Sequence, residues 1–232
     1  MAAKAISDSF LGSYPLRQYR KGDVIIFQGE APRSVYVIES GIVKAYNLTL
    51  AGDEKPVAFY REGDFFPMAW MFDQIESATF FYEAFTKQVD LRAVDKDDIL
   101  KYLRANSEAL YLALSRQASE ELSQSMHINA LQQSRASDKI IYILHFLAIS
   151  SGQRPNDQKL KLAIKLTHQD IANLTGLTRE TTAVELNKLK KRGLINYGSG
   201  QPYCIYLDKL ASLTNDRYLQ ELTVINEQAK RH

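Results

Sequence analysis

The 232-residue sequence contains a single cysteine, Cys204. One cysteine cannot form an intramolecular disulfide, and it excludes any zinc or iron–sulfur site built only from the cysteines of one chain. The longest apolar run, Ile140–Ile149, has about half of the ~20 residues that cross a bilayer, and it contains His145. The first ten residues lack the apolar segment of a signal peptide. We therefore expect a cytoplasmic protein without a membrane span.

Signatures of the common enzyme classes are also absent. The sequence has no Walker-type or dinucleotide-binding glycine loop and no Gly-x-Ser-x-Gly nucleophile turn. Its four histidines, His127, His145, His168 and His232, match no haem motif, and we expect each of them to be hydrogen-bonded in a core or solvated. We therefore expect a protein that is not an enzyme and has no metal site.

Charge is nearly balanced over the whole chain but divided unevenly along it. The sequence has 29 Lys and Arg against 27 Asp and Glu, a net charge of +2. Residues 1–135 hold 15 basic and 18 acidic side chains, whereas residues 136–232 hold 14 and 9. This division indicates that only the second part contacts a polyanion such as nucleic acid. Solvated surface charge is the alternative explanation.

The segment from Tyr19 to Val94 consists of short runs rich in β-branched and aromatic residues, such as Val35–Ile38 and Val57–Tyr60. The runs recur every 8–12 residues or so, and turns such as Lys21-Gly22-Asp23 and Glu62-Gly63-Asp64 separate them. The pattern predicts an antiparallel β-sandwich or barrel.

From about Asp97 to Leu131 the sequence has neither glycine nor proline, and apolar residues recur at helical spacing. The spacing predicts one long helix of six or more turns. An irregular apolar stripe along it could pair with the same helix of a second chain, and the alternative is burial against its own domain. The residues expected at a dimer interface are Tyr111, Leu114, Ala118, Leu122 and Met126.

A polar segment, Gln132–Ser137, ends the apolar pattern and is the expected domain boundary and hinge. Ser137 is the expected N-cap of a following helix over about Asp138–Ser150. We expect a loop over Ser151–Asp157.

The segment Leu166–Ile195 is the most informative part of the chain. Thr167 and Asp170 resemble a capping box, Gly176 can end the short helix that follows, and Thr178 can cap a second helix. We expect the second helix to bury its apolar stripe, whose residues are Thr181, Val184, Leu186 and Leu189. Two short helices joined by a tight turn predict a helix-turn-helix whose second helix enters a DNA major groove.

The first turn of the second helix is expected to present Arg179, Glu180 and Thr182. Arginine can donate two hydrogen bonds to guanine, and glutamate can accept one from cytosine, although an exposed ion pair at a helix start is the alternative. The start of the preceding helix suits a phosphate oxygen, and basic residues near the end of the second helix can hold the DNA backbone. The DNA-binding residues that we expect are Thr167, Gln169, Thr178, Arg179, Glu180, Thr182 and Lys188, supported by Lys190, Lys191 and Arg192.

Two short apolar runs, Leu194–Tyr197 and Tyr203–Tyr206, flank a Gly-Ser-Gly turn and predict a β-hairpin of about four residues a side. Such a hairpin would be the wing of a winged helix. Cys204 lies in this hairpin and is expected to be structural. A terminal helix is expected over Leu213–Arg231.

These segments resemble the bacterial transcription regulators of the cyclic-AMP receptor protein and fumarate–nitrate regulator (CRP/FNR) superfamily. The resemblance covers nearly the whole chain, through KGDVIIFQGE, VYVIESGIVKAY, EGDFF and LTHQDIANLTGLTRETTAVELNKLKKRGLI. It implies an α+β fold with a β-roll (jelly roll) sensor like a cyclic-nucleotide-binding domain, a dimerisation helix and a winged helix-turn-helix. It also implies a homodimer that binds two-fold symmetric DNA and contacts RNA polymerase.

The sequence departs from the family pattern where cyclic AMP binds. Pro67-Met68 stand where cyclic-AMP-binding members have Gly-Glu, and about Thr79-Phe80 stand where they have Arg-Ser. Without that arginine no side chain compensates a buried phosphate, so we do not expect cyclic AMP to bind. The iron–sulfur branch of the family requires several cysteines, which are absent, so we expect no iron–sulfur cluster and an effector of unknown identity. The expected pocket residues are Phe66, Pro67, Met68, Thr79, Phe80, Gln124 and Ser125. Val184 stands where many members have a guanine-reading arginine.

The sequence thus predicts a sensor domain over residues 1–96, a dimerisation helix and hinge over 97–135, and a DNA-binding domain over 136–232. The leading hypothesis is a homodimeric, sequence-specific transcription regulator whose DNA binding an effector controls. The alternative is a small-ligand-binding module whose C-terminal domain mediates protein contacts.

Overall fold

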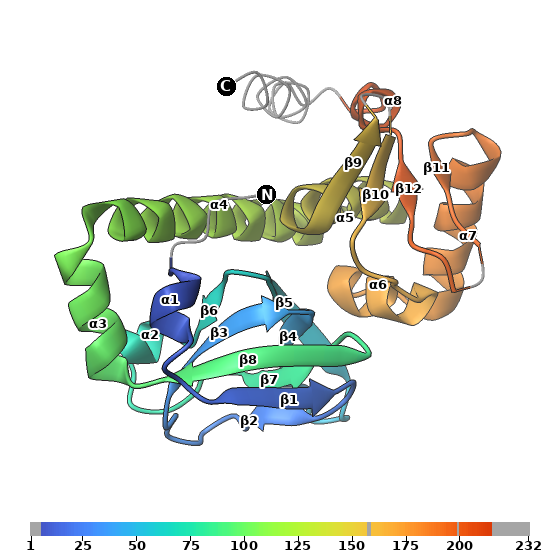
Figure 1. The fold of residues 1–232 in the computed structure, drawn as a ribbon. Coiled ribbons are helices and arrows are strands. Elements are labelled where there is room, and N and C mark those ends of the chain that lie inside the picture. The colour runs from blue at the N-terminus through green and yellow to red at the C-terminus, as the bar shows by residue number, and fades with distance from the viewer. Residues whose placement is uncertain (1–5, 157–158, 199, 215–232) are drawn as a thin grey trace. The chain divides into compact units, whose positions relative to one another are not determined.

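The structure of the protein, a computed structural model, describes residues 6–156, 159–198 and 200–214 (Figure 1). The chain forms two compact units, Met1–Leu122 and Ser123–His232, called unit 1 and unit 2 below. The chain was predicted to have three parts, with boundaries at residues 96 and 135. The two compact units have a single boundary, between Leu122 and Ser123, which does not test that division, so it stays a prediction.

Unit 1 is built around two four-stranded antiparallel sheets, which confirms the predicted β-sandwich (Figure 1). The first sheet has the strand order β1 (Leu16–Arg20), β8 (Gln88–Val94), β3 (Val35–Ser40) and β6 (Phe65–Phe66). The second has the order β2 (Val24–Ile26), β7 (Phe81–Ala84), β4 (Ile42–Leu48) and β5 (Glu54–Arg61). Except for β4 and β5, which are consecutive, neighbouring strands in the two sheets come from distant parts of the sequence, as in a β-roll.

The tight connection between β3 and β4 requires a glycine. Gly41 has a φ of +87°, and a Cβ placed on it would lie 2.5 Å from the carbonyl oxygen of Gln88. Only a residue without a side chain fits this position, since L-residues with a Cβ rarely adopt such a φ.

Alternation along β3 separates two hydrophobic cores. Tyr36 and Ile38 point into the space between the sheets, whereas Val35 and Val37 belong to a second core that includes residues of the helices. Because both faces of β3 are covered, its first four residues, Val35–Ile38, are all apolar or aromatic and buried.

Helices accompany the sheets in unit 1, and the last of them, α4, continues into unit 2. They are α1 (Asp8–Leu11), α2 (Met68–Met71), α3 (Lys96–Ala105) and α4 (Ser107–Gln132). The prediction of one uninterrupted helix from Asp97 to Leu131 is wrong, because the backbone leaves the helical region at Asn106 (φ −127°, ψ 97°). The Asn106 side chain then accepts a hydrogen bond from the Ala109 N–H at 3.1 Å, which caps α4.

Arg116 fixes the first half of α4 to the β-roll. Its guanidinium donates to the Asp64 carboxylate and, at 3.2 Å, to the carbonyl oxygen of Glu62. Gly63 lies directly beneath this guanidinium, where a Cβ would approach to within 2.9 Å. The Glu62-Gly63-Asp64 turn therefore holds α4 as well as reversing the chain.

Unit 2 contains the end of α4, further helices and an antiparallel sheet. The helices are α5 (Ala136–Ser151), α6 (His168–Thr175), α7 (Arg179–Lys191) and α8 (Leu207–Ala211). The sheet has the order β11 (Ile195–Asn196), β12 (Cys204–Ile205), β10 (Lys159–Leu162) and β9 (Gly152–Asn156). The predicted α+β fold, a β-roll with helices and a winged helix-turn-helix, is confirmed.

Three local predictions in unit 2 are wrong. Ser137 does not cap α5, because the helix begins one residue earlier and the Ser137 hydroxyl bonds to Asp138 at 3.0 Å. Ser151–Asp157 was expected to be a loop, whereas α5 includes Ser151 and β9 follows at once. The wing strands β11 and β12 have two residues each, and β12 also pairs with β10.

The predicted terminal helix over Leu213–Arg231 lies almost wholly outside the described residues. Within the described ranges, no helix has the length and apolar character that a membrane span requires.

Candidate nucleic-acid interface

Helix α6 begins with the predicted capping box. The Thr167 hydroxyl accepts from the Asp170 N–H at 3.1 Å, and the Asp170 carboxylate accepts from the Thr167 N–H at 2.7 Å. Each side chain thus satisfies a backbone group that the start of a helix leaves unpaired. The cap fixes where α6 starts.

The turn between α6 and α7 is also set by local chemistry. Gly176 ends α6 in the left-handed conformation (φ 69°, ψ 18°). Two residues later the Thr178 side chain accepts from the Thr181 N–H at 3.2 Å and caps α7. The predicted Thr178 cap and Gly176 stop are confirmed, and together they determine the direction in which α7 leaves the turn.

The first turn of α7 presents polar side chains to solvent. Arg179 and Glu180 are both exposed, and neither guanidinium nor carboxylate forms a hydrogen bond or ion pair with another described residue. The Arg179 guanidinium can therefore donate to the O6 and N7 of guanine, and the Glu180 carboxylate can accept from the N4 amino group of cytosine.

The predicted burial along α7 is confirmed at Leu186 and Leu189 but is wrong at Thr182 and Val184. Thr182 was expected at the exposed face, but it is fully buried with Leu186 and Leu189, so it cannot contact DNA. Val184 was expected in the core, yet 53% of its surface is exposed, and Thr181 is half-buried. The exposed side of α7 therefore runs from Arg179 and Glu180 through Val184.

Thr167 and Gln169 lie at the exposed start of α6, as expected. Both are held by neighbours in their own helix: the Thr167 hydroxyl bonds to the Asp170 carboxylate at 2.7 Å, and the Gln169 amide donates to Asn173 Oδ1 at 2.8 Å. These bonds orient the two side chains at a helix start whose free N–H groups suit a phosphate oxygen.

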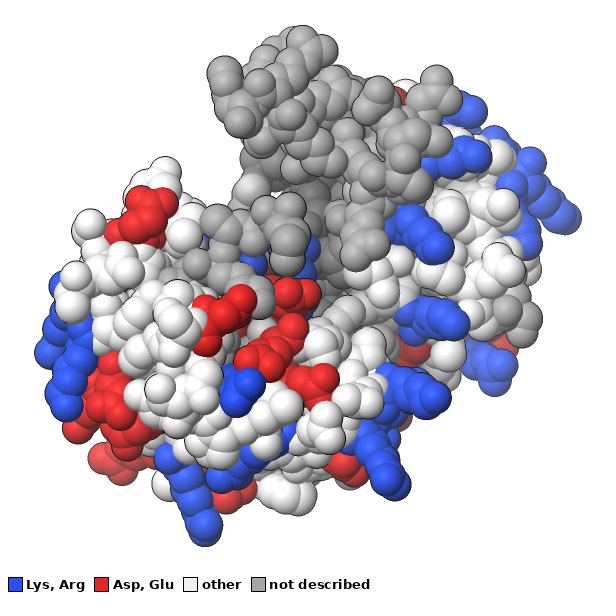
Figure 2. Space-filling model, viewed as in Figure 1, with Lys and Arg blue, Asp and Glu red and all other residues white. Residues whose placement is uncertain are grey.

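The basic residues at the end of α7 have different roles. Lys188 is exposed and pairs with Glu185 at 2.7 Å, whereas Lys190 donates to the carbonyl oxygen of Tyr197 at 2.7 Å. Lys190 also lies 4.6 Å from the centroid of the Tyr197 ring, so it ties α7 to the wing. Lys191 and Arg192 are exposed. Lys and Arg dominate the visible face of unit 2, and acidic side chains gather mainly over unit 1 (Figure 2).

Tyr197 is a neighbour of α7 whose contacts the sequence pattern did not indicate. Its hydroxyl donates to Asn187 Oδ1 at 2.9 Å, and its ring packs 4.7 Å from that of Tyr203, centroid to centroid. Tyr197 thereby holds the base of the wing against α7. An aromatic residue at a strand end is too common a feature to have indicated this role.

His127 connects α4 to the helix-turn-helix within unit 2. Its Nε2 donates to the carbonyl oxygen of Leu174 at 2.9 Å, near the end of α6, and its ring stacks on Phe146 at 4.8 Å. Burial lowers the pKa of His127 below its usual 6.5, while the hydrogen bond opposes that change. The neutral ring is therefore the form that the fold stabilises.

The pKa of His127 makes the stability of unit 2 depend on pH. Because the folded-state pKa is lowered, the contribution of His127 is complete above pH 6.5 and is lost as pH falls below it, by up to about 1.4 kcal/mol per pH unit. We expect the urea midpoint to fall from pH 7.5 to pH 5.5, and to fall less in His127→Gln, which keeps a donor but does not titrate. Equal falls in both proteins would contradict this role.

Two family models match the chain. The cyclic nucleotide-binding domain matches residues 16–106, and the Crp-like helix-turn-helix domain matches residues 139–215. The chain belongs to the CRP/FNR family. It is 26% identical over 199 residues to the global nitrogen regulator of Nostoc sp. (83% of this chain, 89% of the relative). It is equally identical to the cyclic AMP receptor protein of Thermus thermophilus (83% and 85%).

Solved structures show the same fold. A transcriptional regulator of the CRP/FNR family from Thermus thermophilus superposes with a TM-score of 0.66 at 23% identity, covering 88% of this chain and all of that one (100%). The 232-residue chain is therefore a CRP/FNR transcription regulator with a helix-turn-helix DNA-binding domain. In that domain, the exposed first turn of α7 carries a guanidinium and a carboxylate that form no hydrogen bond or ion pair with another described residue.

The residues expected to form an effector pocket in this CRP/FNR regulator have different environments. Phe66 and Pro67 are buried, Met68 and Phe80 are half-buried, and Thr79 is exposed. The Phe66 ring lies 4.9 Å from Tyr82 and 5.5 Å from Tyr60, centroid to centroid, so aromatic rings fill the interior of the roll there. Gln124 and Ser125 are exposed residues of α4 in unit 2.

Most of the expected dimerisation residues are exposed along one side of α4. Tyr111 and Leu114 expose 66% and 60% of their surfaces, Ala118 is exposed and Leu122 is half-buried. Met126 was expected on this face, but it is buried within the single chain and belongs to the core instead.

Proposed function

We propose that this regulator binds a two-fold symmetric DNA site as a homodimer, with the first turn of α7 in the major groove of each half-site. The observation that carries the proposal is the pair Arg179 and Glu180, exposed and unpaired within the described residues at the capped start of α7. Arg179 donates to guanine, Glu180 accepts from cytosine, and Thr178 and the start of α6 contact phosphates. Val184 contributes an apolar surface that suits a thymine methyl group.

The apolar side of α4 supports the homodimer. At 100° per residue, Leu110, Leu114 and Ala118 lie within about 80° of one another around the helix, and Tyr111 and Ile128 continue the same side. A row of large exposed apolar side chains on one helix is typical of a protein interface. Pairing this row with a second copy places two recognition helices in one complex, as a symmetric site requires.

We further propose that an effector other than cyclic AMP acts through unit 1 on the segment between α4 and α5, residues 133–135, and so changes the population of the DNA-binding arrangement. Contact with RNA polymerase and a cytoplasmic location are part of the same proposal, and they rest on membership of the family.

Lys188→Ala is expected to weaken binding to every DNA sequence by a similar factor and to reduce the slope of log K against log salt by about 1, because Lys188 neutralises one phosphate without reading bases. Fluorescence anisotropy at several salt concentrations measures the slope. Lys101→Ala is the matched control, since Lys101 also pairs with a carboxylate three residues away, but in unit 1. An unchanged slope in Lys188→Ala would contradict the phosphate contact.

The experiment that tests the homodimer is sedimentation velocity at tens of micromolar, with and without a duplex that the protein binds. We expect a free species of twice the 26.4 kDa chain mass, and two chains on one duplex. A single chain on the duplex would overturn the proposed mode of binding.

A further inference from the structure

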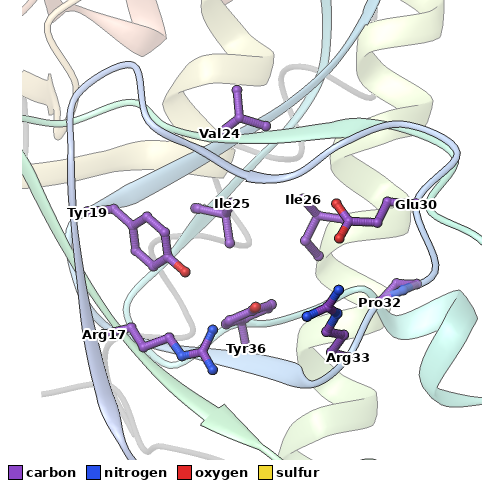
Figure 3. A pocket seen from close by; sticks show the side chains of 9 residues that line it. All are labelled: Arg17, Tyr19, Val24, Ile25, Ile26, Glu30, Pro32, Arg33 and Tyr36. Atoms are coloured by element: carbon purple, nitrogen blue, oxygen red, sulfur yellow. The ribbon is translucent and has the colours of Figure 1, made fainter.

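A pocket of about 250 Å³ opens into unit 1 among β1, β2, the β2–β3 connection and β3 (Figure 3). Its lining consists of Arg17, Tyr19, Val24, Ile25, Ile26, Glu30, Pro32, Arg33 and Tyr36. It includes none of the seven residues expected to form the family's effector pocket, although Tyr36 stacks on one of them, Phe66, with ring centroids 5.7 Å apart.

Two arginines from different segments converge on this pocket. Arg17 comes from β1 and Arg33 from the β2–β3 connection, and their guanidinium groups lie on either side of the Tyr36 side chain (Figure 3). Neither arginine forms a hydrogen bond or ion pair with any residue that the structure describes. By contrast, Arg92 and Arg116 in the same unit each contact a carboxylate, Glu39 and Asp64.

The remaining lining provides an apolar floor and hydroxyl donors. Ile26 and Pro32 are buried, and the Tyr19 hydroxyl points toward Tyr36 (Figure 3). Burial raises the pKa of Tyr36, and the nearby Tyr19 raises it further while Arg17 opposes the rise, so the Tyr36 hydroxyl keeps its proton and can donate. Glu30, the one carboxylate in the lining, accepts a hydrogen bond from the Phe27 N–H at 3.4 Å.

We propose that this pocket binds a small metabolite that carries an oxyanion group, a carboxylate or a phosphate, between Arg17 and Arg33. A guanidinium presents a planar set of donors that matches both kinds of oxyanion, and two of them leave a net positive charge beside the single Glu30. The volume lies just below the roughly 300–1,000 Å³ of pockets for drug-sized ligands, so the ligand is a small metabolite. This function goes beyond DNA binding, because the pocket lies wholly within unit 1.

Isothermal titration calorimetry on the full chain tests the site, with inorganic phosphate and malonate as separate probes. We expect at least one probe to bind, and Arg17→Gln and Arg33→Gln each to weaken that binding about tenfold or more. Arg20→Gln is the matched control, because it removes the same charge from the end of β1 outside the pocket, and it should bind as the wild type does. Thermal melting of each variant checks that unit 1 remains folded.

Binding of phosphate alone identifies a phosphoryl ligand, and binding of malonate alone identifies a carboxylate ligand. Either result supports the site if Arg17→Gln and Arg33→Gln weaken the observed binding and Arg20→Gln does not. The proposal is overturned if neither probe binds at about 10 mM, which corresponds to less than about 2.7 kcal/mol of binding energy. It is also overturned if all three variants weaken binding equally, since that result indicates general charge attraction.

Discussion

Arg179→Ala is expected to reduce discrimination between a selected DNA site and random DNA by about 5- to 150-fold per half-site, or roughly 1–3 kcal/mol. The Arg179 guanidinium is exposed at the capped start of α7 and has no partner among the described residues, so its hydrogen-bonding capacity is free for a base. Competition binding at one fixed salt concentration measures the ratio of the two affinities.

Arg192→Ala is the control for Arg179→Ala. Arg192 carries the same charge at the other end of α7, where it is exposed. Loss of a phosphate contact there should lower both affinities together and leave their ratio unchanged. The assignment of base reading to Arg179 is wrong if its removal leaves the ratio at the wild-type value, or if Arg192→Ala changes the ratio as much.

Leu114→Glu is expected to convert the protein to a monomer and to lower its affinity for a symmetric site at least about 100-fold, because the second half-site then no longer adds to binding. Leu114 exposes 60% of its surface in the middle of the apolar row on α4, and a carboxylate there would be buried without a partner on pairing. Size-exclusion chromatography with light scattering gives the mass, and anisotropy gives the affinity.

Ser119→Glu controls for the added charge. Ser119 is exposed on the same helix but lies about 140° around it from Leu114, at 100° per residue. This variant should remain a dimer and bind DNA as the wild type does. A dimeric Leu114→Glu protein with unchanged affinity would show that another surface joins the two chains.

The parts of the interface that the sequence predicted correctly depend on short-range chemistry. The Thr167–Asp170 capping box, the left-handed Gly176 and the Thr178 cap each involve groups three or fewer residues apart. Such interactions depend on the local residues alone, so the starts of α6 and α7 could be predicted from the sequence.

Which side chains of α7 are buried and which are exposed was harder to predict from the sequence. Val184 was expected in the core because it is apolar and Thr182 at the surface because it is polar, and the structure reverses both. Both side chains are β-branched and similar in size, so packing against the rest of unit 2, rather than polarity, decides which one is buried.

The interrupted long helix and β9 have tertiary causes. Asn106 is compatible with a helix, but it caps α4 as the chain turns out of α3. Gly152–Asn156 contains a glycine and a proline and is typical of a loop, yet it pairs with β10 at the edge of the unit 2 sheet. The burial of Met126 likewise depends on packing that helical spacing alone does not specify.

Selection of bound sequences from a random DNA pool tests the central claim most directly, namely that two copies of α7 read a symmetric site. We expect the enriched sequences to contain an inverted repeat with a preferred G·C pair in each half, and half-sites about 10 base pairs apart between centres. Arg179→Ala should lose the preference at that G·C pair. Failure to enrich any sequence, or enrichment of a single half-site without its inverted copy, would contradict this claim.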